Sequence, residues 1–375
     1  MSNKQTKRYF ITGGGTGGHI YPAMAVADEL NKLDDVEIFY VGNPNNLEYK
    51  IVTEKGYTFL PVDVEGLPRK LGLKFVLCAT KLFFSVIKSF YYLIKYSPDK
   101  IFGTGGYVSA PILIAASILK NPPFMMHDCD AKAGLVTRKL SPYANKISVS
   151  FEKAKEFLNN KNILLNGNPL RPEFKTLTKE VAKDKLGLDK SRPTLLVMGG
   201  SQGAKTICKS FVEIIKEFSK TNNIQIILQT GAKNYDETIK RLEQIYPAYN
   251  EDKNVTIKPY FEDMVTTLKS ADIVISRAGS LSLSEIFASD VVPILIPYPY
   301  AASNHQRVNA RYVSEKDACI YLEENDADSN TLKLTINNLL NDKNLQRKLR
   351  ENSSSLAKYD ALENIVTQFI NIGEE

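Results

Sequence analysis

The chain has 375 residues, which at about 150 residues per domain predicts two or three domains. This length buries a sizeable core and so excludes a small disulfide or metal scaffold. Hydrophobic residues form 43% of the chain and charged residues 24%, which excludes a disordered protein. The four cysteines are far apart and form no C-x-x-C pair, which argues against a zinc site and is typical of a reducing compartment. The net charge of +6 is modest, so its position matters more than its size.

The first ten residues are polar and contain no apolar signal-peptide core, so we expect the protein to stay in the cytoplasm. Two stretches, 75–94 and 101–119, are apolar, but neither gives about 20 continuous apolar helical residues. We therefore predict no transmembrane helix.

Apolar runs that end in turn residues and lead into helical patterns recur along the chain, which is typical of α/β architecture with parallel sheets. The expected strands of the first half are Tyr9–Thr12, Val36–Val41, Lys100–Phe102 and Pro123–Met126. Those of the second half are Thr194–Met198, Ile224–Gln229, Val255–Ile257, Ile273–Ser276 and Pro293–Ile296. In each half the first of these strands runs into glycines, so the two halves repeat one pattern.

This pattern predicts two doubly wound, Rossmann-like domains that face a cleft, with ligands beyond the carboxyl ends of the strands. We expect an N-terminal domain over residues 1–165 and a C-terminal domain over 166–345. The hinge is expected at Asn166-Gly-Asn-Pro-Leu-Arg-Pro, which has two prolines and a glycine. Residues 346–375 are expected to form a helical segment that packs back on the N-terminal domain.

The first motif is Gly13-Gly-Gly-Thr-Gly-Gly-His-Ile-Tyr-Pro, between a strand and a helix. Glycines allow positive φ and close approach of a ligand, and the helix start offers N–H groups to an anion. The motif satisfies G-x-G-x-x-G, but the acid that a dinucleotide site needs about 20 residues later is absent from Val41-Gly-Asn-Pro-Asn. This weakens a dehydrogenase interpretation, and no P-loop lysine follows.

The whole excess of positive charge lies between residues 66 and 100, where seven basic residues accompany one acid. Lys74, Lys81, Lys88 and Lys95 are spaced seven apart and form one stripe on a helix, flanked by large apolar residues. One interpretation is an amphipathic helix with a solvated lysine face. The other is a peripheral patch for an anionic membrane surface. Nucleic acid is not expected, because no binding motif accompanies the basic residues.

Two further motifs lie at strand-to-helix turns of the second half. Gly199-Gly-Ser-Gln-Gly-Ala repeats the glycine-rich turn. Ser276-Arg-Ala-Gly-Ser-Leu-Ser-Leu-Ser-Glu opens a helix with serines and carries Glu285 one turn in. This arrangement suits a diphosphate at the helix start and a carboxylate that reaches ribose hydroxyls, although an acid near a helix start is often merely structural.

The last motif is the polar loop Pro297-Tyr-Pro-Tyr-Ala-Ala-Ser-Asn-His-Gln-Arg-Val-Asn-Ala. The three histidines, His19, His127 and His305, all lie in or beside glycine-rich or polar segments at strand ends. They have no H-x-x-x-H spacing, so we expect no metal.

Taken together, the motifs resemble the MurG family of peptidoglycan N-acetylglucosaminyltransferases, over nearly the whole chain and in matching order. The segments that carry the resemblance are Gly14–His19, Gly105–Tyr107, Gly167–Arg171, Gly199–Ala204, Arg277–Glu285 and His305–Ala310. The resemblance implies the GT-B fold, a UDP-N-acetylglucosamine donor and a lipid-linked muramoyl-pentapeptide acceptor. It also implies inversion to a β-1,4 linkage, no metal or other cofactor, and a peripheral location on the cytoplasmic side of the cell membrane.

The resemblance also assigns roles to residues of this sequence. His19 is the candidate general base for the acceptor hydroxyl. Thr16, Gly17 and Gly18 would contact the donor, Ser201 and Arg171 would hold its diphosphate, and the backbone at Phe261 would contact the uracil edge. Ser280, Leu281, Ser282, Leu283 and Ser284 would supply helix-start N–H groups, Glu285 the ribose contact, and Gln306 a contact to the sugar hydroxyls.

One segment departs from the family pattern His-Glu-x-Asn, because it has His127-Asp-Cys-Asp. Asp128 shortens the usual glutamate, and Asp130 places a carboxylate where an amide contacts the donor sugar. A carboxylate beside a diphosphate is unfavourable unless it bonds a sugar hydroxyl or is paired, with Lys132 as a candidate partner. The departure concerns the choice of donor sugar rather than the fold or the reaction class.

Three other functions stay open from the sequence. One is a GT-B glycosyltransferase of another glycolipid or polysaccharide pathway that uses a different UDP-sugar. Another is a nucleotide-sugar binding subunit without catalysis. The last is a dehydrogenase, which the missing acid disfavours.

Overall fold

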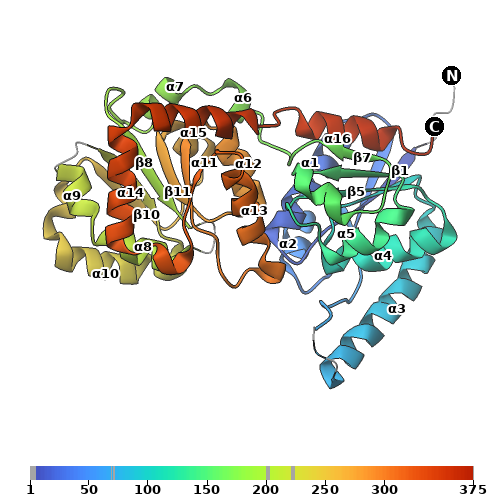
Figure 1. The fold of residues 1–375 in the computed structure, drawn as a ribbon. Helices are drawn as coiled ribbons and strands as arrows, with labels where there is room; N and C mark the ends of the chain where they lie inside the picture. Colours follow the sequence, from blue (N-terminus) through green and yellow to red (C-terminus); the bar gives the residue numbers. More distant parts are fainter. Residues whose placement is uncertain (1–5, 69, 71, 200–202, 221–223, 375) are drawn as a thin grey trace. The chain divides into compact units, whose positions relative to one another are not determined.

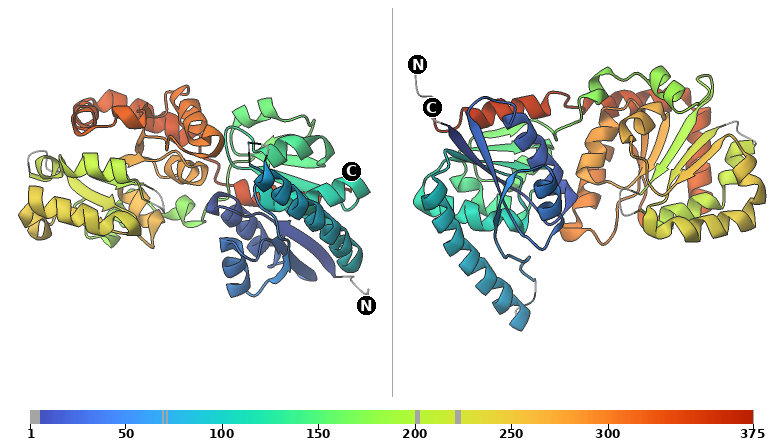
Figure 2. Two further views of the ribbon diagram at one scale, coloured as in Figure 1. Left: turned by 90° about the horizontal axis from the view of Figure 1, so that it is seen from below. Right: turned by 180° about the vertical axis from the view of Figure 1, so that it is seen from behind.

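The computed structural model describes residues 6–68, 70, 72–199, 203–220 and 224–374. The chain forms two compact units, and we call them unit 1 (Met1–Pro169 with Asp360–Glu375) and unit 2 (Leu170–Tyr359). Each contains one parallel sheet with helices on both faces (Figures 1 and 2). The prediction of two doubly wound α/β domains is confirmed.

Unit 1 contains a sheet of seven strands in the order β3-β2-β1-β4-β5-β6-β7. Its elements in chain order are β1 (Lys7–Thr12), α1 (Gly17–Leu30), β2 (Val36–Gly42), α2 (Leu47–Glu54), β3 (Thr58–Pro61), α3 (Leu73–Tyr96), β4 (Lys100–Gly103), α4 (Gly106–Leu119), β5 (Phe124–Asp128), α5 (Leu135–Leu140), β6 (Lys146–Val149), β7 (Ile163–Leu165) and α16 (Ala361–Ile370), with 3₁₀ turns at Ser141–Tyr143 and Glu152–Phe157.

Unit 2 contains a sheet of six strands in the order β10-β9-β8-β11-β12-β13. Its elements are α6 (Glu173–Thr176), α7 (Lys179–Lys185), β8 (Thr194–Met198), α8 (Lys205–Val212), α9 (Ile215–Lys220), β9 (Gln225–Gln229), α10 (Tyr235–Ile245), β10 (Val255–Lys258), α11 (Met264–Ser270), β11 (Ile273–Ser276), α12 (Ser280–Phe287), β12 (Val292–Leu295), α13 (His305–Ser314), β13 (Ile320–Tyr321), α14 (Ser329–Asn341) and α15 (Lys343–Ser355), with 3₁₀ turns at Ala232–Asn234, Pro247–Glu251, Ala302–Asn304 and Glu324–Asp326.

The strand order of each sheet reverses direction once, between β1 and β4 in unit 1 and between β8 and β11 in unit 2. In open parallel sheets, ligands bind beyond the carboxyl ends of the strands at such a reversal. The first glycine-rich motif follows β1, and the serine-rich motif follows β11. Both motifs therefore lie where the topology favours a binding site.

Strand β1 illustrates how the core of unit 1 is built on two faces. Phe10 packs in one cluster of buried residues, while Tyr9 and Ile11 pack in the other, as expected from the two-residue period of a strand. The helix α16 belongs to the second cluster, since the ring of Phe369 lies 5.3 Å from the ring of Tyr9 between centroids. The last helix of the chain therefore completes the core of unit 1.

The C-terminal segment differs from the expectation for residues 346–375. The structure divides this segment: α15 belongs to unit 2 and α16 to unit 1. Buried Leu349 joins the core cluster of unit 2, whereas Ile365 and Phe369 join a cluster of unit 1. Of this segment, the last helix packs on unit 1, as expected, whereas α15 packs on unit 2. The passage from unit 1 to unit 2 lies at Pro169–Leu170, within the segment expected as a hinge.

Four strands were not expected from the sequence, namely β3, β6, β7 and β13. They contain between two and four residues, which is too short for an alternating or continuous apolar pattern to be recognised. The expected strands are present, with ends that differ by at most two residues.

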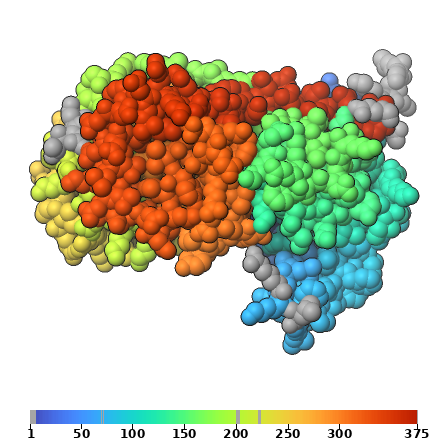
Figure 3. Space-filling view, in the orientation of Figure 1, coloured from blue at the N-terminus to red at the C-terminus, as the bar shows by residue number. Residues whose placement is uncertain are grey.

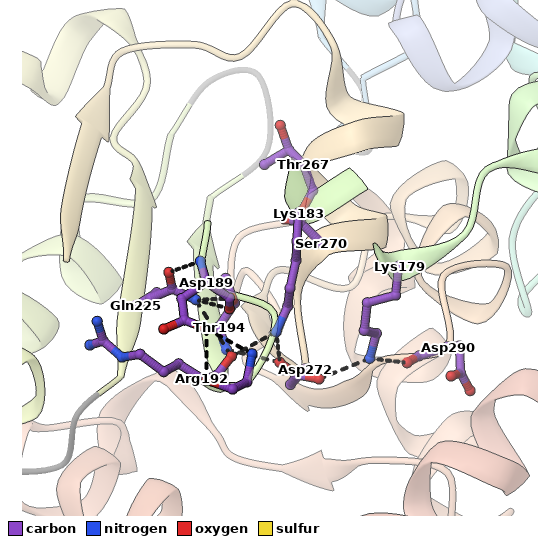
Figure 4. A network of polar contacts seen from close by, with 11 residues as sticks. Lys179, Lys183, Asp189, Arg192, Thr194, Gln225, Thr267, Ser270, Asp272 and Asp290 are labelled. Carbon is purple, nitrogen blue, oxygen red and sulfur yellow. Dashed lines mark hydrogen bonds and ion pairs between the residues drawn. The ribbon is translucent and has the colours of Figure 1, made fainter. Parts of the chain in front are cut away.

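A polar network lies at the amino ends of the strands of unit 2, opposite the motif-bearing edge (Figure 4). Asp272 pairs with Lys179 and Lys183, each at 3.0 Å, and accepts the N–H of Thr194 at 2.9 Å. Burial opposes the charge of Asp272, but Lys179 and these hydrogen bonds lower its pKa overall. The network connects α7 to the amino ends of β8 and β11 and so stabilises this edge of the sheet.

Candidate active site

The glycine-rich turn of unit 1 connects β1 to α1 and leads to His19. Gly15 has a φ of +83°, a conformation that side chains rarely adopt, so the turn requires glycine there. Thr16 is the N-cap of α1, and its carbonyl accepts the N–H of His19 at 3.0 Å. The N–H groups of Gly17 and Gly18 lie before this bond, in the first turn, where a helix presents donors to a ligand. Thr16, Gly17 and Gly18, expected to contact the donor, lie together at this helix start.

The imidazole of His19 is oriented by Thr104, which directly follows β4. Its Nδ1 lies 2.8 Å from the carbonyl oxygen of Thr104. Because a carbonyl only accepts, Nδ1 carries the proton and the lone pair is on Nε2. Thr104 also donates its hydroxyl to the carbonyl of His19 at 2.7 Å. The ring is thus held in the tautomer that a general base needs.

The turn after β4 packs directly against this ring. Gly105 and Gly106 have φ values of +77° and +74°. A Cβ on Gly106 would lie 3.0 Å from Cδ2 of His19 and 3.0 Å from the carbonyl oxygen of Gly14. The second glycine pair therefore allows the backbone to approach both the histidine and the first glycine-rich turn.

The segment that departs from the family pattern lies beside the same helix start. The thiol of Cys129 donates to the carbonyl of Gly18 at a distance of 3.4 Å. Asp128 is buried and accepts the N–H groups of Gly134 (2.8 Å) and Asp130 (3.3 Å). Burial raises the pKa of Asp128. Asp128 thus shapes the turn, while Asp130 remains half-buried next to it.

The other two histidines have structural positions. His127 is completely buried, and its ring lies 3.0 Å from the hydroxyl of Ser148 and 3.1 Å from the amide oxygen of Asn168. Burial lowers the pKa of His127 to about 4, so the ring is neutral at neutral pH. The ring of His305 is half-buried, and its Nδ1 bonds the carbonyl of Ala302 at the start of α13.

The glycine-rich turn of unit 2 follows β8. Ser201, expected to hold the diphosphate, lies outside the described residues. Gly203 has a φ of +76°, and a Cβ there would lie 2.2 Å from the carbonyl oxygen of Thr230. The end of this turn therefore packs tightly on the strand end of β9 and requires glycine.

The helix α12 begins after Gly279, which is its N-cap. The first hydrogen bond runs from the N–H of Leu283 to the carbonyl of Gly279 at 2.9 Å. The N–H groups of Ser280, Leu281 and Ser282 lie before it, in the first turn of the helix. Leu283 differs from the expectation, because its N–H already has an acceptor and its side chain is buried. Ser284 likewise lies beyond the first turn, where N–H groups bond within the helix.

Arg171 and Glu285 were expected to contact different parts of the donor, and the structure joins them directly. Nη2 of Arg171 lies 3.0 Å from Oε1 of Glu285, and the two side chains are 45% and 25% exposed. Burial raises the pKa of Glu285, while Arg171 opposes this shift. The pair places a guanidinium beside α12.

Two expected contacts are already partly used within the protein. The N–H of Phe261 donates to Oε1 of Gln229 at 3.1 Å, so a uracil contact there has to use the carbonyl oxygen instead. Oε1 of Gln306 accepts the N–H of Tyr298 at 2.9 Å, which leaves its amide NH₂ group for a sugar hydroxyl. The side chains of Gln229 and Gln306 thus hold the backbone at Phe261 and Tyr298 in place.

A cavity of about 540 Å³ in unit 2 reaches Arg171. Its other lining residues come from α6 and its C-cap, α7, α11 and the turn before α11, and carry both signs of charge: Glu173, Thr176, Leu177, Lys185, Glu262, Asp263, Val265 and Thr266. Arg277, in contrast, is buried and paired with Glu324, so its role is structural. Within the described ranges, no group of three or more His, Cys, Asp or Glu side chains could hold a metal ion.

The helix α3 carries the second candidate surface, and in Figure 3 it lies at the surface of unit 1. Its buried side is small, since only Cys78, Ser85, Ser89, Tyr92 and Leu93 are buried. Eight large apolar residues of α3 are exposed: Leu73, Val76, Leu77, Phe83, Phe84, Ile87, Tyr91 and Ile94. At about 100° per residue they share one side of the helix, with the lysine stripe beside them.

The lysine stripe is less uniform than expected. Lys81 pairs with Asp63 at 3.2 Å and with Glu65 at 2.6 Å, whereas Lys74, Lys88 and Lys95 are exposed. No helix in the part of the chain that the structure describes is both long and apolar enough to span a membrane. The exposed face of α3 therefore combines apolar side chains with three lysines.

Three residues that shape these sites were not predicted from the sequence, namely Glu48, Thr104 and Gln229. Glu48 accepts the N–H of Gly15, so the chain itself supplies a carboxylate to the first glycine-rich turn. Gln229 ends a buried strand, and a polar residue at such a position was a signal that could have been used. Thr104 and Glu48 contact segments that are distant in the sequence, so no local pattern could predict their roles.

Comparison with known proteins covers both units. The model of the glycosyltransferase family 28 N-terminal domain matches residues 9–149, and that of the C-terminal domain matches residues 194–365. The chain is 38% identical to the UDP-N-acetylglucosamine--N-acetylmuramyl-(pentapeptide) pyrophosphoryl-undecaprenol N-acetylglucosamine transferase of Caldanaerobacter subterraneus subsp. tengcongensis, over 94% of this chain and 96% of that one. The enzyme of the same name from Bacillus pumilus is 34% identical, over 98% and 99%.

Among solved structures, MurG of Acinetobacter baumannii superposes with a TM-score of 0.78 at 23% identity, covering 97% of this chain and 99% of that one. The complex of S. aureus MnaA with UDP gives a TM-score of 0.68 at 12% identity, with 98% of each chain covered. These structures share the fold of two parallel-sheet α/β domains.

Proposed function

This chain belongs to the MurG family of glycosyltransferases, and on that premise we propose how its residues carry out the family's reaction. The protein transfers N-acetylglucosamine from UDP-N-acetylglucosamine to the muramoyl-pentapeptide of lipid I, with inversion to the β-1,4 linkage of lipid II. The observation that carries this function is that the similarity to transferases of that name runs through both units rather than through one nucleotide-binding half.

In the reaction, His19 acts on the acceptor. Its Nε2 accepts the proton of the acceptor hydroxyl as the oxygen attacks the anomeric carbon of the donor. The bond between that carbon and the UDP oxygen breaks, and the electron pair leaves with UDP. The bond from Nδ1 to the carbonyl of Thr104 supports this role, because a carbonyl that accepts from Nδ1–H stabilises the imidazolium formed.

Unit 2 holds the donor and stabilises the leaving group. Departing UDP gains negative charge, which the guanidinium of Arg171 and the first N–H groups of α12 stabilise. Glu285 positions Arg171 through their ion pair and accepts hydrogen bonds from ribose hydroxyls. Gln306 donates to the sugar, and Ser201 contacts the diphosphate. With these groups as the charge compensation, the transfer needs no metal ion.

The exposed face of α3 binds the cytoplasmic surface of the membrane, where a lipid-linked acceptor lies. Apolar side chains such as Phe84 enter the headgroup region, and Lys88 and Lys95 meet anionic lipid at about 1 kcal/mol each. This proposal is supported by the exposed apolar residues on one side of α3, because a large apolar surface in contact with water is unfavourable.

The central experiment measures transfer of labelled sugar from UDP-N-acetylglucosamine to a lipid I analogue, with and without EDTA. We expect equal rates in both, and His19→Ala is expected to bind UDP normally but to lose most of its turnover. Activity abolished by EDTA would contradict the proposed charge compensation, and full turnover of His19→Ala would remove the base. A panel of other UDP-sugars tests whether the departure at Asp130 alters the donor.

The membrane surface is tested by sedimentation with vesicles that contain or lack phosphatidylglycerol. Removing one inserted aromatic side chain costs about 1–2 kcal/mol, so Phe84→Ser should bind anionic vesicles about tenfold more weakly. Leu334→Ser, which changes a similarly exposed apolar residue on α14, serves as the control and should bind normally. Equal binding of the two variants would exclude α3 as the contact surface.

A further inference from the structure

Glu48, in the first turn of α2, is a carboxylate whose side chain is completely buried. A buried charge is costly unless it is paired or strongly hydrogen-bonded. Among the residues that the structure describes, Glu48 forms no ion pair, and its hydrogen bonds come from N–H groups alone. A solvated acid on a helix is common, whereas the complete burial of Glu48 without a cation indicates a specific role for its carboxylate.

Both oxygens of Glu48 are used. Oε2 accepts the N–H of Gly15 at 3.2 Å. Oε1 accepts the N–H of Asn43 at 3.2 Å and the side-chain Nδ2 of Asn46, also at 3.2 Å. The carboxylate therefore joins the first glycine-rich turn to the segment after β2, and its charge is stabilised by N–H groups rather than by a cation.

The glycine-rich turn lies directly against this carboxylate. A Cβ on Gly14 would lie 2.5 Å from Oε1 of Glu48. Asn46 also donates to the hydroxyl of Tyr107 at 3.0 Å, and a Cβ on Gly15 would lie 2.8 Å from the ring of Tyr107. Glu48, Asn46 and Tyr107 thus enclose the turn on one side.

The other side of the same turn is held by Thr104, which also orients His19. A Cβ on Gly13 would lie 2.0 Å from Oγ1 of Thr104, and that hydroxyl donates to the carbonyl of His19. The position of the His19 ring relative to the carbonyl of Thr104 therefore depends on where the turn from Gly13 to Thr16 lies. A shift of that turn changes the 2.8 Å contact that selects the tautomer of His19.

We propose that Glu48 is a positioning residue of the transferase: an internal anion that accepts the N–H of Gly15 in the glycine-rich turn and thereby holds His19 in register for proton transfer. The inference rests on the proposed function, since it assigns a role in the same reaction. Because the anion belongs to the chain, the turn is ordered before any substrate phosphate arrives.

The decisive variant is Glu48→Gln, which retains the shape of the side chain. An amide has one acceptor oxygen, so its NH₂ group must face an N–H of Gly15 or Asn43, and donor opposes donor. A displacement of the base by less than 1 Å is expected to lower kcat about 10- to 100-fold. The KM for UDP-N-acetylglucosamine should rise less than kcat falls, because most of the assigned donor contacts are made by residues of unit 2.

A second readout does not depend on turnover. In protein labelled with ¹⁵N-histidine, the ring nitrogen shifts of His19, assigned with His19→Ala, report its tautomer. We expect the wild-type spectrum to show the Nδ1–H form and Glu48→Gln to show a mixed or altered form. If the wild-type protein has no transferase activity, the proposed function fails, while this spectrum still tests Glu48.

The matched control is Asp272→Asn, which changes another largely buried carboxylate that accepts a backbone N–H, in unit 2 and away from the motifs. It should lower the melting temperature but leave kcat unchanged well below that temperature. Unchanged kcat or an unchanged His19 spectrum in folded Glu48→Gln would overturn the proposal, as would an equal loss of kcat in Asp272→Asn. If Glu48→Gln does not fold, Asn46→Ala removes one donor to the carboxylate and the contact to Tyr107. It should reduce kcat in the same way, and full activity would refute the proposal.

Discussion

The pair of Arg171 and Glu285 offers a sharp test of the donor site, through the variant Glu285→Gln. The two side chains lie 3.0 Å apart and are 45% and 25% exposed, so water screens the pair. An ion pair of this exposure contributes at most about 1 kcal/mol to folding, and the melting temperature should hardly change. A hydrogen bond from a ribose hydroxyl to a carboxylate is worth about 1.5–3 kcal/mol. Loss of that amount weakens UDP binding about 10- to 100-fold.

The assay is titration calorimetry with UDP. The control is Glu213→Gln, because Glu213 pairs with Arg241 at 2.8 Å with similar exposures of 32% and 49%. It should bind UDP as the wild type does. If Glu285→Gln binds UDP with unchanged affinity, the carboxylate does not contact the nucleotide and the assignment is refuted.

The variant Glu285→Gln also allows us to test how the affinity for UDP depends on pH. Burial raises the pKa of Glu285, so its carboxylate takes up a proton at a higher pH than an ordinary glutamate does as the solution is acidified. The affinity of the wild type for UDP should therefore decrease as the pH falls through that raised pKa. Glu285→Gln has no such proton to bind, so its affinity should lack this part of the pH dependence.

Three further predictions concern stability. The pKa of His127 is about 4 in the folded protein and about 6.5 in the unfolded chain, so the free energy of unfolding should fall by about 3 kcal/mol as the pH drops from 6.5 to 4. Denaturant unfolding of His127→Gln should lack this loss. An equal loss in the variant would show that another group titrates. Asp272→Asn leaves the 5%-exposed Lys183 without its carboxylate and should lower the free energy of unfolding in urea by about 3 kcal/mol. In the wild type, the contribution of Asp272 to stability is present above the ordinary aspartate pKa and disappears as the pH falls through its lowered pKa. A loss below about 1 kcal/mol would contradict a buried ion pair. Lys100 donates to the carbonyl of Ile370, so Lys100→Met should accelerate amide exchange in α16, whereas unchanged exchange would mean that core packing alone holds this helix.

The sequence alone determined the architecture and the places of the motifs in it, because both depend on short-range physics. Buried parallel strands need continuous apolar runs, and strand-to-helix turns with positive φ need glycine, as at Gly15 and Gly203. The motifs could therefore be placed at strand ends without coordinates. The basic and apolar character of residues 66–100 was also visible, although the pairing of Lys81 was not.

Only the tertiary structure decided which side chains act together. Arg171 and Glu285 are 114 residues apart, and the sequence could not show that they form one ion pair. Glu48 reaches a turn 33 residues earlier, and α16 crosses back to the core of unit 1. Such contacts depend on how strands order themselves in a sheet and on which faces remain to be covered. The strand order and the faces left to be covered are properties of the whole packed chain, so a local sequence pattern cannot predict them.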